Sequence, residues 1–229
     1  MKCHTLPEVR AILLDIEGTI SPLAFVREVL FPYSRSKISS FILANQNRTA
    51  VVQILAEASR LSGGLDPVTA LVGWHDRDEK SPPLKELQGL IWEQGYREGA
   101  LVSTLFIDAL EAIRQWNQSG IPVYIYSSGS LHAQDLFFEH NEAGDLRALF
   151  SGFFDTGIGA KTASASYEEI VRKIDIDANS LLFLSDSVAE LRAAEQAGLM
   201  VMHVVKDATV PVAGFKPVHS FRDILAPRL

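Results

Sequence analysis

Short apolar runs recur along the chain, and each ends in a cluster of polar residues. The first, Ala11–Leu14, is followed directly by Asp15 and by a glycine turn at Gly18. A continuous apolar run of this length predicts a strand that is buried on both faces, as in a parallel sheet. The same pattern predicts strands at 123–126, 152–154 and 181–184. Each predicted strand therefore delivers polar side chains at its carboxyl end.

Helical patterns lie between the later predicted strands. Apolar residues recur at helical spacing over 106–119, 131–140, 167–174 and 188–197. Strands that alternate with crossover helices predict an α/β fold with a doubly wound parallel sheet, in which ligands bind beyond the carboxyl ends of the strands. We assign a Rossmann-like catalytic core to residues 1–21 and 102–229, and we expect its polar clusters to converge.

Residues 22–101 interrupt this alternation. Phe25 and Val29 are separated by one helical turn, and Pro32 indicates the start of a new helix. Further helices are predicted at 49–61, 67–75 and 83–96. We therefore expect an all-helical cap inserted after the first strand. Such a cap can act as a lid that excludes water from a site at the strand ends.

Composition and charge narrow the class of partner. The 229 residues are 47% hydrophobic, enough for one domain with an insertion, and the net charge of -7 argues against a nucleic-acid or anionic-membrane partner. The single cysteine, Cys3, leaves no intramolecular disulfide or cysteine-rich zinc site. We expect neither a signal peptide nor a membrane span, because residues 1–10 contain no apolar stretch of the required length and no uninterrupted apolar run is long enough to cross a bilayer. We expect a soluble, cytoplasmic monomer that acts on a small molecule.

Asp15 and Glu17 lie two residues apart at the end of the first predicted strand. This spacing allows one carboxylate to attack a phosphorus atom while the other exchanges a proton with the leaving oxygen. Gly18 permits a tight turn whose backbone N–H groups can bind phosphate oxygens. The pattern is short, and the alternative is a surface turn with two solvated acids.

Three further positions supply groups that a phosphate site needs. Ser127 and Ser128 precede a predicted helix, where they can bind phosphate or simply cap the helix. Lys161 follows a strand and can neutralise a phosphoryl group and a carboxylate, whereas most lysines are simply solvated. Asp186 ends another apolar run and, opposite Asp15, can complete an oxygen-ligand site for Mg²⁺.

Other polar and aromatic residues have a structural alternative of equal or greater weight. Glu190 either holds a metal-bound water or is a charge favoured near a helix N-terminus. The six histidines show no zinc-type spacing. Trp92, Tyr96 and Phe106 are more typical of a core than of a ligand cage.

The order of the candidate residues resembles the four motifs of the haloacid dehalogenase superfamily. The matching positions are Asp15-x-Glu17-Gly18-Thr19, Ser127 or Ser128, Lys161 and Asp186. In that superfamily the first aspartate forms a covalent phospho-enzyme, the serine or threonine and the lysine hold phosphate, and the last acidic motif completes a magnesium site. Glu17 departs from the usual Asp-x-Asp, and Asp-Ile-Glu-Gly-Thr is similar to the version carried by the enolase-phosphatase (acireductone synthase) family. The resemblance continues through 25–33, 84–92, 124–130 and 153–156.

The resemblance implies a substrate and a role for each of the site residues. The substrate of that family is 2,3-diketo-5-methylthiopentyl 1-phosphate, which is enolised and then dephosphorylated to 1,2-dihydroxy-3-keto-5-methylthiopentene in methionine salvage. We expect Asp15, the backbone carbonyl of Glu17 and Asp186 to hold Mg²⁺, and Glu17 to be the acid and base. Either Glu17 or a residue of the lid is the base for enolisation.

Three other activities are compatible with parts of the pattern. A phosphatase of the same fold that performs no enolisation differs only in its substrates. A dehalogenase is disfavoured because Glu17 supplies an acid that halide departure does not need. A phosphometabolite-binding protein is disfavoured because nucleophile, acid, lysine and metal ligands are all present.

Overall fold

The computed structural model describes residues 9–79, 81–206 and 209–224. Within them the chain divides into two compact units, one made of residues up to Leu23 and from Ser103 onward, the other of Ala24–Val102. The second unit is therefore an insertion between the first strand and the rest of the first unit. Its action as a lid stays a prediction.

The first unit is built on a six-stranded parallel sheet with the order β3-β2-β1-β4-β5-β6. This arrangement confirms the predicted α/β fold with a parallel sheet. Four strands match predicted runs, and β5 and β6 were not predicted, although the apolar residues Leu199–Met202 overlap β5. In chain order the strands are β1 (Ala11–Leu14), β2 (Val123–Tyr126), β3 (Gly152–Phe154), β4 (Leu181–Ser185), β5 (Met200–Val204) and β6 (Pro217–Val218).

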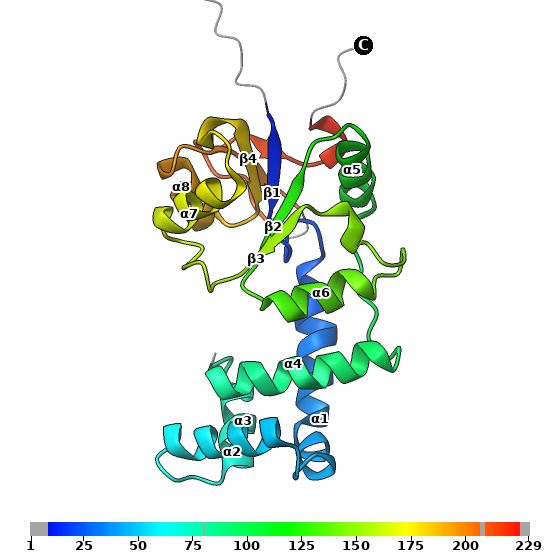
Figure 1. Ribbon diagram of the computed structural model, residues 1–229, viewed down its shortest axis with the longest axis vertical. Coiled ribbons are helices and arrows are strands. Elements are labelled where there is room, and N and C mark those ends of the chain that lie inside the picture. Colours follow the sequence, from blue (N-terminus) through cyan, green and yellow to red (C-terminus); the bar gives the residue numbers. More distant parts are fainter. Residues whose placement is uncertain (1–8, 80, 207–208, 225–229) are drawn as a thin grey trace, which may run out of the picture. The chain divides into compact units, whose positions relative to one another are not determined.

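Helices cover both faces of this sheet. Figure 1 shows α7 (Ser164–Ile174) and α8 (Val188–Gln196) on one face and α5 (Ile107–Gln118) on the other. Leu13 and Phe183, from neighbouring strands, pack in one buried cluster with Tyr167 of α7 and Leu191 of α8. Because successive side chains of a strand point to opposite faces, Ile12 and Leu14 are buried toward the α5 side. The remaining helix of this unit is α6 (Leu131–Glu139), and short 3₁₀ turns lie at Arg147–Leu149, Ala178–Ser180 and Phe221–Asp223.

The strand register brings three strand ends to one edge. Leu14 pairs with Ile125 of β2 and with Leu184 of β4. The residues that follow these positions, Asp15, Tyr126 and Ser185, are therefore at the same level of the sheet. This register is the physical reason that polar clusters far apart in the sequence meet at the carboxyl edge.

In the described part of the second unit, the regular elements are all helices. It contains a π-helical segment (Phe25–Leu30) and the helices α1 (Phe31–Ala44), α2 (Thr49–Leu61), α3 (Pro67–Asp76) and α4 (Pro82–Arg97). Its core joins side chains of all four α-helices, among them Ile38, Ile54, Leu71 and Leu87. The unit therefore has a hydrophobic core of its own.

Pro32 does not begin a separate helix after a break. α1 begins one residue earlier at Phe31, and Leu30 and Phe31 both keep helical backbone angles, so the π-helical segment runs directly into α1. The Phe31 N–H bonds the Val26 carbonyl five residues back, and Pro32, which has no N–H to donate, follows this π-helical turn. Along the described residues, no helix combines the length and the apolar character needed to cross a membrane.

Candidate active site

Asp15 occupies the first position after β1, where its carboxylate is buried. The Thr19 hydroxyl donates to Asp15 Oδ2 at 3.0 Å. Between them Gly18 has a φ of +78°, and a Cβ at that position would collide with the carboxylate of Asp186. A glycine is therefore required here both for the left-handed backbone and for the approach of a second acid.

Lys161 lies at the centre of the acidic cluster. Its Nζ forms an ion pair with Asp15 Oδ1 and another, at 2.8 Å, with Glu190 Oε2. Burial lowers the pKa of Lys161, but the charges of Asp15 and Glu190 outweigh it and raise the pKa, so the ammonium stays charged. Burial and the Asp15 charge raise the pKa of Glu190 to about 7, against the opposing effect of Lys161.

Glu17 contacts the serine that follows β2. The hydroxyl of Ser127 lies 3.3 Å from Glu17 Oε2 and also accepts the Gly129 N–H at 3.1 Å. Loss of hydration and the neighbouring charge of Asp15 raise the pKa of Glu17 above its usual range. A carboxyl group with a raised pKa holds its proton more readily, which suits a general acid.

Asp186 is connected to Asp15 through Thr19. Its backbone N–H donates to the Thr19 hydroxyl at 3.0 Å, and its carbonyl accepts a bond from His203 Nε2 at 3.1 Å. Burial and the Asp15 charge raise the pKa of Asp186 to about 6. The charges of Asp15 and Asp186 therefore repel each other, while hydrogen bonds to the Thr19 hydroxyl connect the two residues.

The charge of this cluster fits a divalent cation. Among the residues that the structure describes, Lys161 is the cation that acts on the four carboxyl groups of Asp15, Glu17, Asp186 and Glu190. Oxygen ligands of this kind suit Mg²⁺. No group of three or more His, Cys, Asp or Glu side chains that could hold a metal is found in the part of the chain that the structure describes. The predicted ligand set differs from such a group, since it has two carboxylates and a backbone carbonyl.

The structure brings most of the predicted residues together. Asp15, Lys161 and Glu190 are in direct contact, as are Glu17 and Ser127. Ser128 is exposed, and Ser130, which belongs to the same loop, caps α6 by accepting the Ala133 N–H at 3.2 Å. Ser130 therefore caps the helix, whereas phosphate binding by Ser127 or Ser128 stays a prediction.

Two residues of this cluster had no predicted role. Thr19 was noted only as part of a motif, and His203 lies on a strand that was not predicted. The position of Thr19 after the glycine turn was a usable signal, because the turn folds it back onto Asp15. His203 carries no such signal, since only the pairing of β4 with β5 brings it to Asp186.

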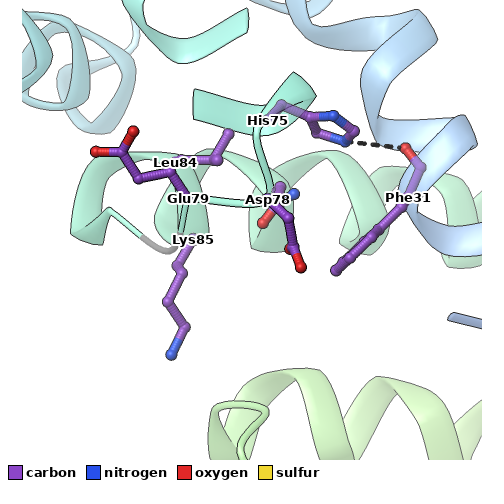
Figure 2. Close-up of a pocket in the computed structure, with 7 residues that line it drawn as sticks. Phe31, His75, Asp78, Glu79, Leu84 and Lys85 are labelled. Carbon is purple, nitrogen blue, oxygen red and sulfur yellow. Dashed lines mark hydrogen bonds between the residues drawn. The ribbon is translucent and has the colours of Figure 1, made fainter. Parts of the chain in front are cut away.

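The helical unit has small cavities of its own. Figure 2 shows one of about 30 Å³, where His75 Nε2 lies 3.1 Å from the carbonyl oxygen of Phe31. This volume holds about one or two water molecules. A second, open hollow of about 230 Å³ is lined by residues of α1, including Lys37, by residues of α4, and by Glu98, which follows α4. Neither cavity contains a residue of the acidic cluster.

Comparisons with known proteins define the class. The family model described as a haloacid dehalogenase-like hydrolase matches residues 9–198. The fold of the crystal structure of CbbY from Rhodobacter sphaeroides is similar, with a TM-score of 0.63 at 20% identity over 94% of this chain and 96% of that one. The fold, the acidic cluster and the family match define a haloacid dehalogenase-like hydrolase.

Closer relatives identify the family within that class. The chain is 48% identical to enolase-phosphatase E1 of Aquifex aeolicus over 94% of this chain and 99% of the relative. It is 47% identical to the Bradyrhizobium enolase-phosphatase E1 over 95% and 94%. The UTR4 protein of Saccharomyces cerevisiae superposes with a TM-score of 0.80 at 32% identity, over 93% of this chain and 99% of that one. The chain belongs to the enolase-phosphatase E1 family.

Proposed function

We propose that this protein converts 2,3-diketo-5-methylthiopentyl 1-phosphate to 1,2-dihydroxy-3-keto-5-methylthiopentene and phosphate in methionine salvage. The observation that carries the proposal is the ion pair between buried Asp15 and Lys161, with Glu17, whose pKa is raised by burial and by the Asp15 charge, two residues further on. Membership of the enolase-phosphatase E1 family supports the substrate. The proposal includes Asp15 as nucleophile and Glu17 as acid and base.

In the first step of phosphate release, after enolisation, a carboxylate oxygen of Asp15 attacks phosphorus. The bond between phosphorus and the ester oxygen breaks, and the proton of Glu17 passes to the departing enol oxygen. In the second step Glu17, now a carboxylate, takes a proton from water, whose oxygen attacks the aspartyl phosphate and releases inorganic phosphate. The raised pKa of Glu17 supports both directions of proton transfer.

The phosphate group needs positive charge and hydrogen-bond donors. Lys161, already paired with Asp15, would hold a phosphate oxygen beside the nucleophile. Ser127 would donate its hydroxyl, and Ser128, which is exposed, is the second candidate donor. These groups position the phosphate in line with attack and stabilise the charge of the transferring group.

Mg²⁺ is the cofactor that the ligand set suits. Asp15, the backbone carbonyl of Glu17 and Asp186 would hold it. When bound, the ion supplies positive charge that offsets repulsion between a carboxylate nucleophile and a phosphate dianion. Asp15 and Asp186 must then stay close together, and the hydrogen bonds that the Thr19 hydroxyl makes to both residues would hold them there.

Enolisation precedes phosphate release and needs a base near the carbon that bears the ester. Glu17 is one candidate and a residue of the helical unit is the other.

We further propose that the helical unit acts as the lid, that the protein is a monomer, and that it works in the cytoplasm.

The deciding experiment incubates the purified protein with the diketo-phosphate, with and without Mg²⁺. Phosphate release and the ultraviolet absorbance of the conjugated enol are followed together, with Asp15→Asn as the control variant. Coupled release and enol formation that need Asp15 and Mg²⁺ are expected. Release from many phosphate esters without an enol signal would leave a general phosphatase, and undiminished release by Asp15→Asn would refute the nucleophile.

A further inference from the structure

The backbone that carries Lys161 is held by an unusual set of partners. Lys161 lies between β3 and α7, outside any regular element, yet its side chain is only 8% exposed. Loop segments are normally mobile and lie on the surface. A buried ammonium that must meet two carboxylates therefore needs its backbone fixed by other means.

Three buried hydroxyl groups bond three consecutive carbonyls of this loop. Tyr126 donates to the carbonyl of Gly159 at 3.0 Å. Ser166 donates to the carbonyl of Ala160 at 2.8 Å, and Tyr167 donates to that of Lys161 at 2.7 Å. Tyr126 ends β2, whereas Ser166 and Tyr167 lie in α7, so two separate elements hold the loop.

Packing fixes the donors themselves. The rings of Tyr126 and Tyr167 meet edge to face at 5.5 Å, and Tyr167 packs on Phe183 of β4 at 5.2 Å. Lys161 Nζ lies 5.6 Å from the centre of the Tyr126 ring. Gly159 has a φ of +141°, and a Cβ there would collide with the Ser166 hydroxyl. Burial raises the pKa of both tyrosines, so that their hydroxyls stay protonated as donors.

We infer that Tyr126, Ser166 and Tyr167 form a hydroxyl clamp that positions Lys161 against Asp15 and the bound phosphate. The inference rests on the proposed function in assigning Lys161 to the phosphate. The three hydroxyls bond the loop that carries Lys161 and act through that lysine, so they are positioning residues. The competing explanation is that the hydroxyls merely satisfy buried carbonyls, as buried polar groups generally require.

The test removes the two tyrosine hydroxyls one at a time and follows Lys161 directly. Tyr167→Phe and Tyr126→Phe keep the rings and delete the donors. Tyr124→Phe is the matched control, because Tyr124 lies on the same strand as Tyr126 and its ring packs on Phe154 at 6.1 Å. Its hydroxyl makes no hydrogen bond to any residue that the structure describes.

The first readout is the rate at which a small acylating reagent modifies Lys161, measured by mass spectrometry against exposed Lys173 of α7 in the same sample. We expect the relative rate to rise about tenfold in Tyr167→Phe and Tyr126→Phe, since a lost bond to a buried carbonyl shifts local opening by that order. Tyr124→Phe should match the wild type.

The second readout is the dissociation constant of inorganic phosphate in the presence of Mg²⁺, measured by calorimetry. We expect it to rise about tenfold in each clamp variant, since a factor of ten corresponds to one weakened charged contact. A lowered thermal midpoint with unchanged acylation and unchanged phosphate affinity would mean that the hydroxyls only support folding, and the inference would be wrong. An equal effect in Tyr124→Phe would also overturn it.

The measurements distinguish a failure of the proposed function from a failure of the hydroxyl clamp. If the wild type does not turn over the diketo-phosphate but acylation of Lys161 rises as expected, the substrate is wrong and the clamp stands. If the wild type turns the substrate over and acylation is unchanged in the variants, the clamp is wrong and the function stands.

Discussion

Thr19 offers the sharpest test of how the acidic cluster is held. Its fully buried hydroxyl donates to Asp15 at 3.0 Å and accepts the backbone N–H of Asp186 at 3.0 Å. Thr19→Val replaces the hydroxyl by a methyl of similar size, so it removes both bonds without opening a cavity. Thr19→Ser keeps the hydroxyl and removes only the methyl.

The structure sets the size of the effect. A hydrogen bond to a charged group contributes about 1.5–3 kcal/mol, and a buried N–H without a partner costs about 1–3 kcal/mol. Thr19→Val should therefore lose about 3–5 kcal/mol of unfolding free energy. Thr19→Ser should lose about 1 kcal/mol, the value of one buried methyl group. The variants should thus differ by at least about 2 kcal/mol, in the order opposite to their hydrophobicity.

Urea unfolding at pH 7 measures this difference, and phosphate release with Mg²⁺ measures its consequence. Thr19→Val should also lose most of its phosphate release, because the two aspartates are no longer held by one group. Equal stability of the two variants would refute the bridging role of the hydroxyl. Full activity of Thr19→Val would show that the hydrogen bonds of the Thr19 hydroxyl are not needed for catalysis.

Three further predictions concern the general acid Glu17, two glycines of the helical unit, and the partly buried carboxylate of Asp108. Glu17→Gln should reduce turnover by about 10²–10⁴-fold, as for loss of a general acid, with phosphate affinity measured in parallel and little changed. In α4, Gly95→Ala should destabilise the protein by about 1–2 kcal/mol, because the added Cβ would overlap the ring of Tyr33. Gly89→Ala, whose Cβ would enter open space, should stabilise it by up to about 1 kcal/mol. Thermal unfolding measures both, and the opposite ranking of the two variants would contradict the packing. Burial opposes ionisation of Asp108, but its bonds to Lys206 and the Phe221 N–H lower its pKa in the folded state. The stabilisation is therefore present above the unfolded pKa of about 3.9 and disappears as pH falls through the lower folded value. Asp108→Asn should be less stable at pH 7 and approach the wild type near pH 3 in urea titrations.

Local pattern predicted the elements whose signals are local. The run Ala11–Leu14 became β1, and the segment 49–61 became α2 with the predicted bounds. The edge strand β6 has two residues and no periodicity to detect. The π-helical segment Phe25–Leu30 was read as an ordinary helix because the two share their apolar spacing over so short a length. The features that stayed unpredicted are therefore of two kinds: strands that form by pairing with distant segments, and a helical variant too short to be distinguished by its apolar spacing.

For the site, the sequence by itself determined which chemical groups stand at the ends of strands. It placed Asp15, Ser127 and Asp186 there, because an apolar run that stops at a polar residue marks a strand end. Only the tertiary structure decided that Lys161 pairs with both Asp15 and Glu190, and that three hydroxyls hold its loop. The physical reason is that the lateral order of parallel strands, and the packing of α7 on them, arise from long-range contacts that no local stretch of sequence encodes.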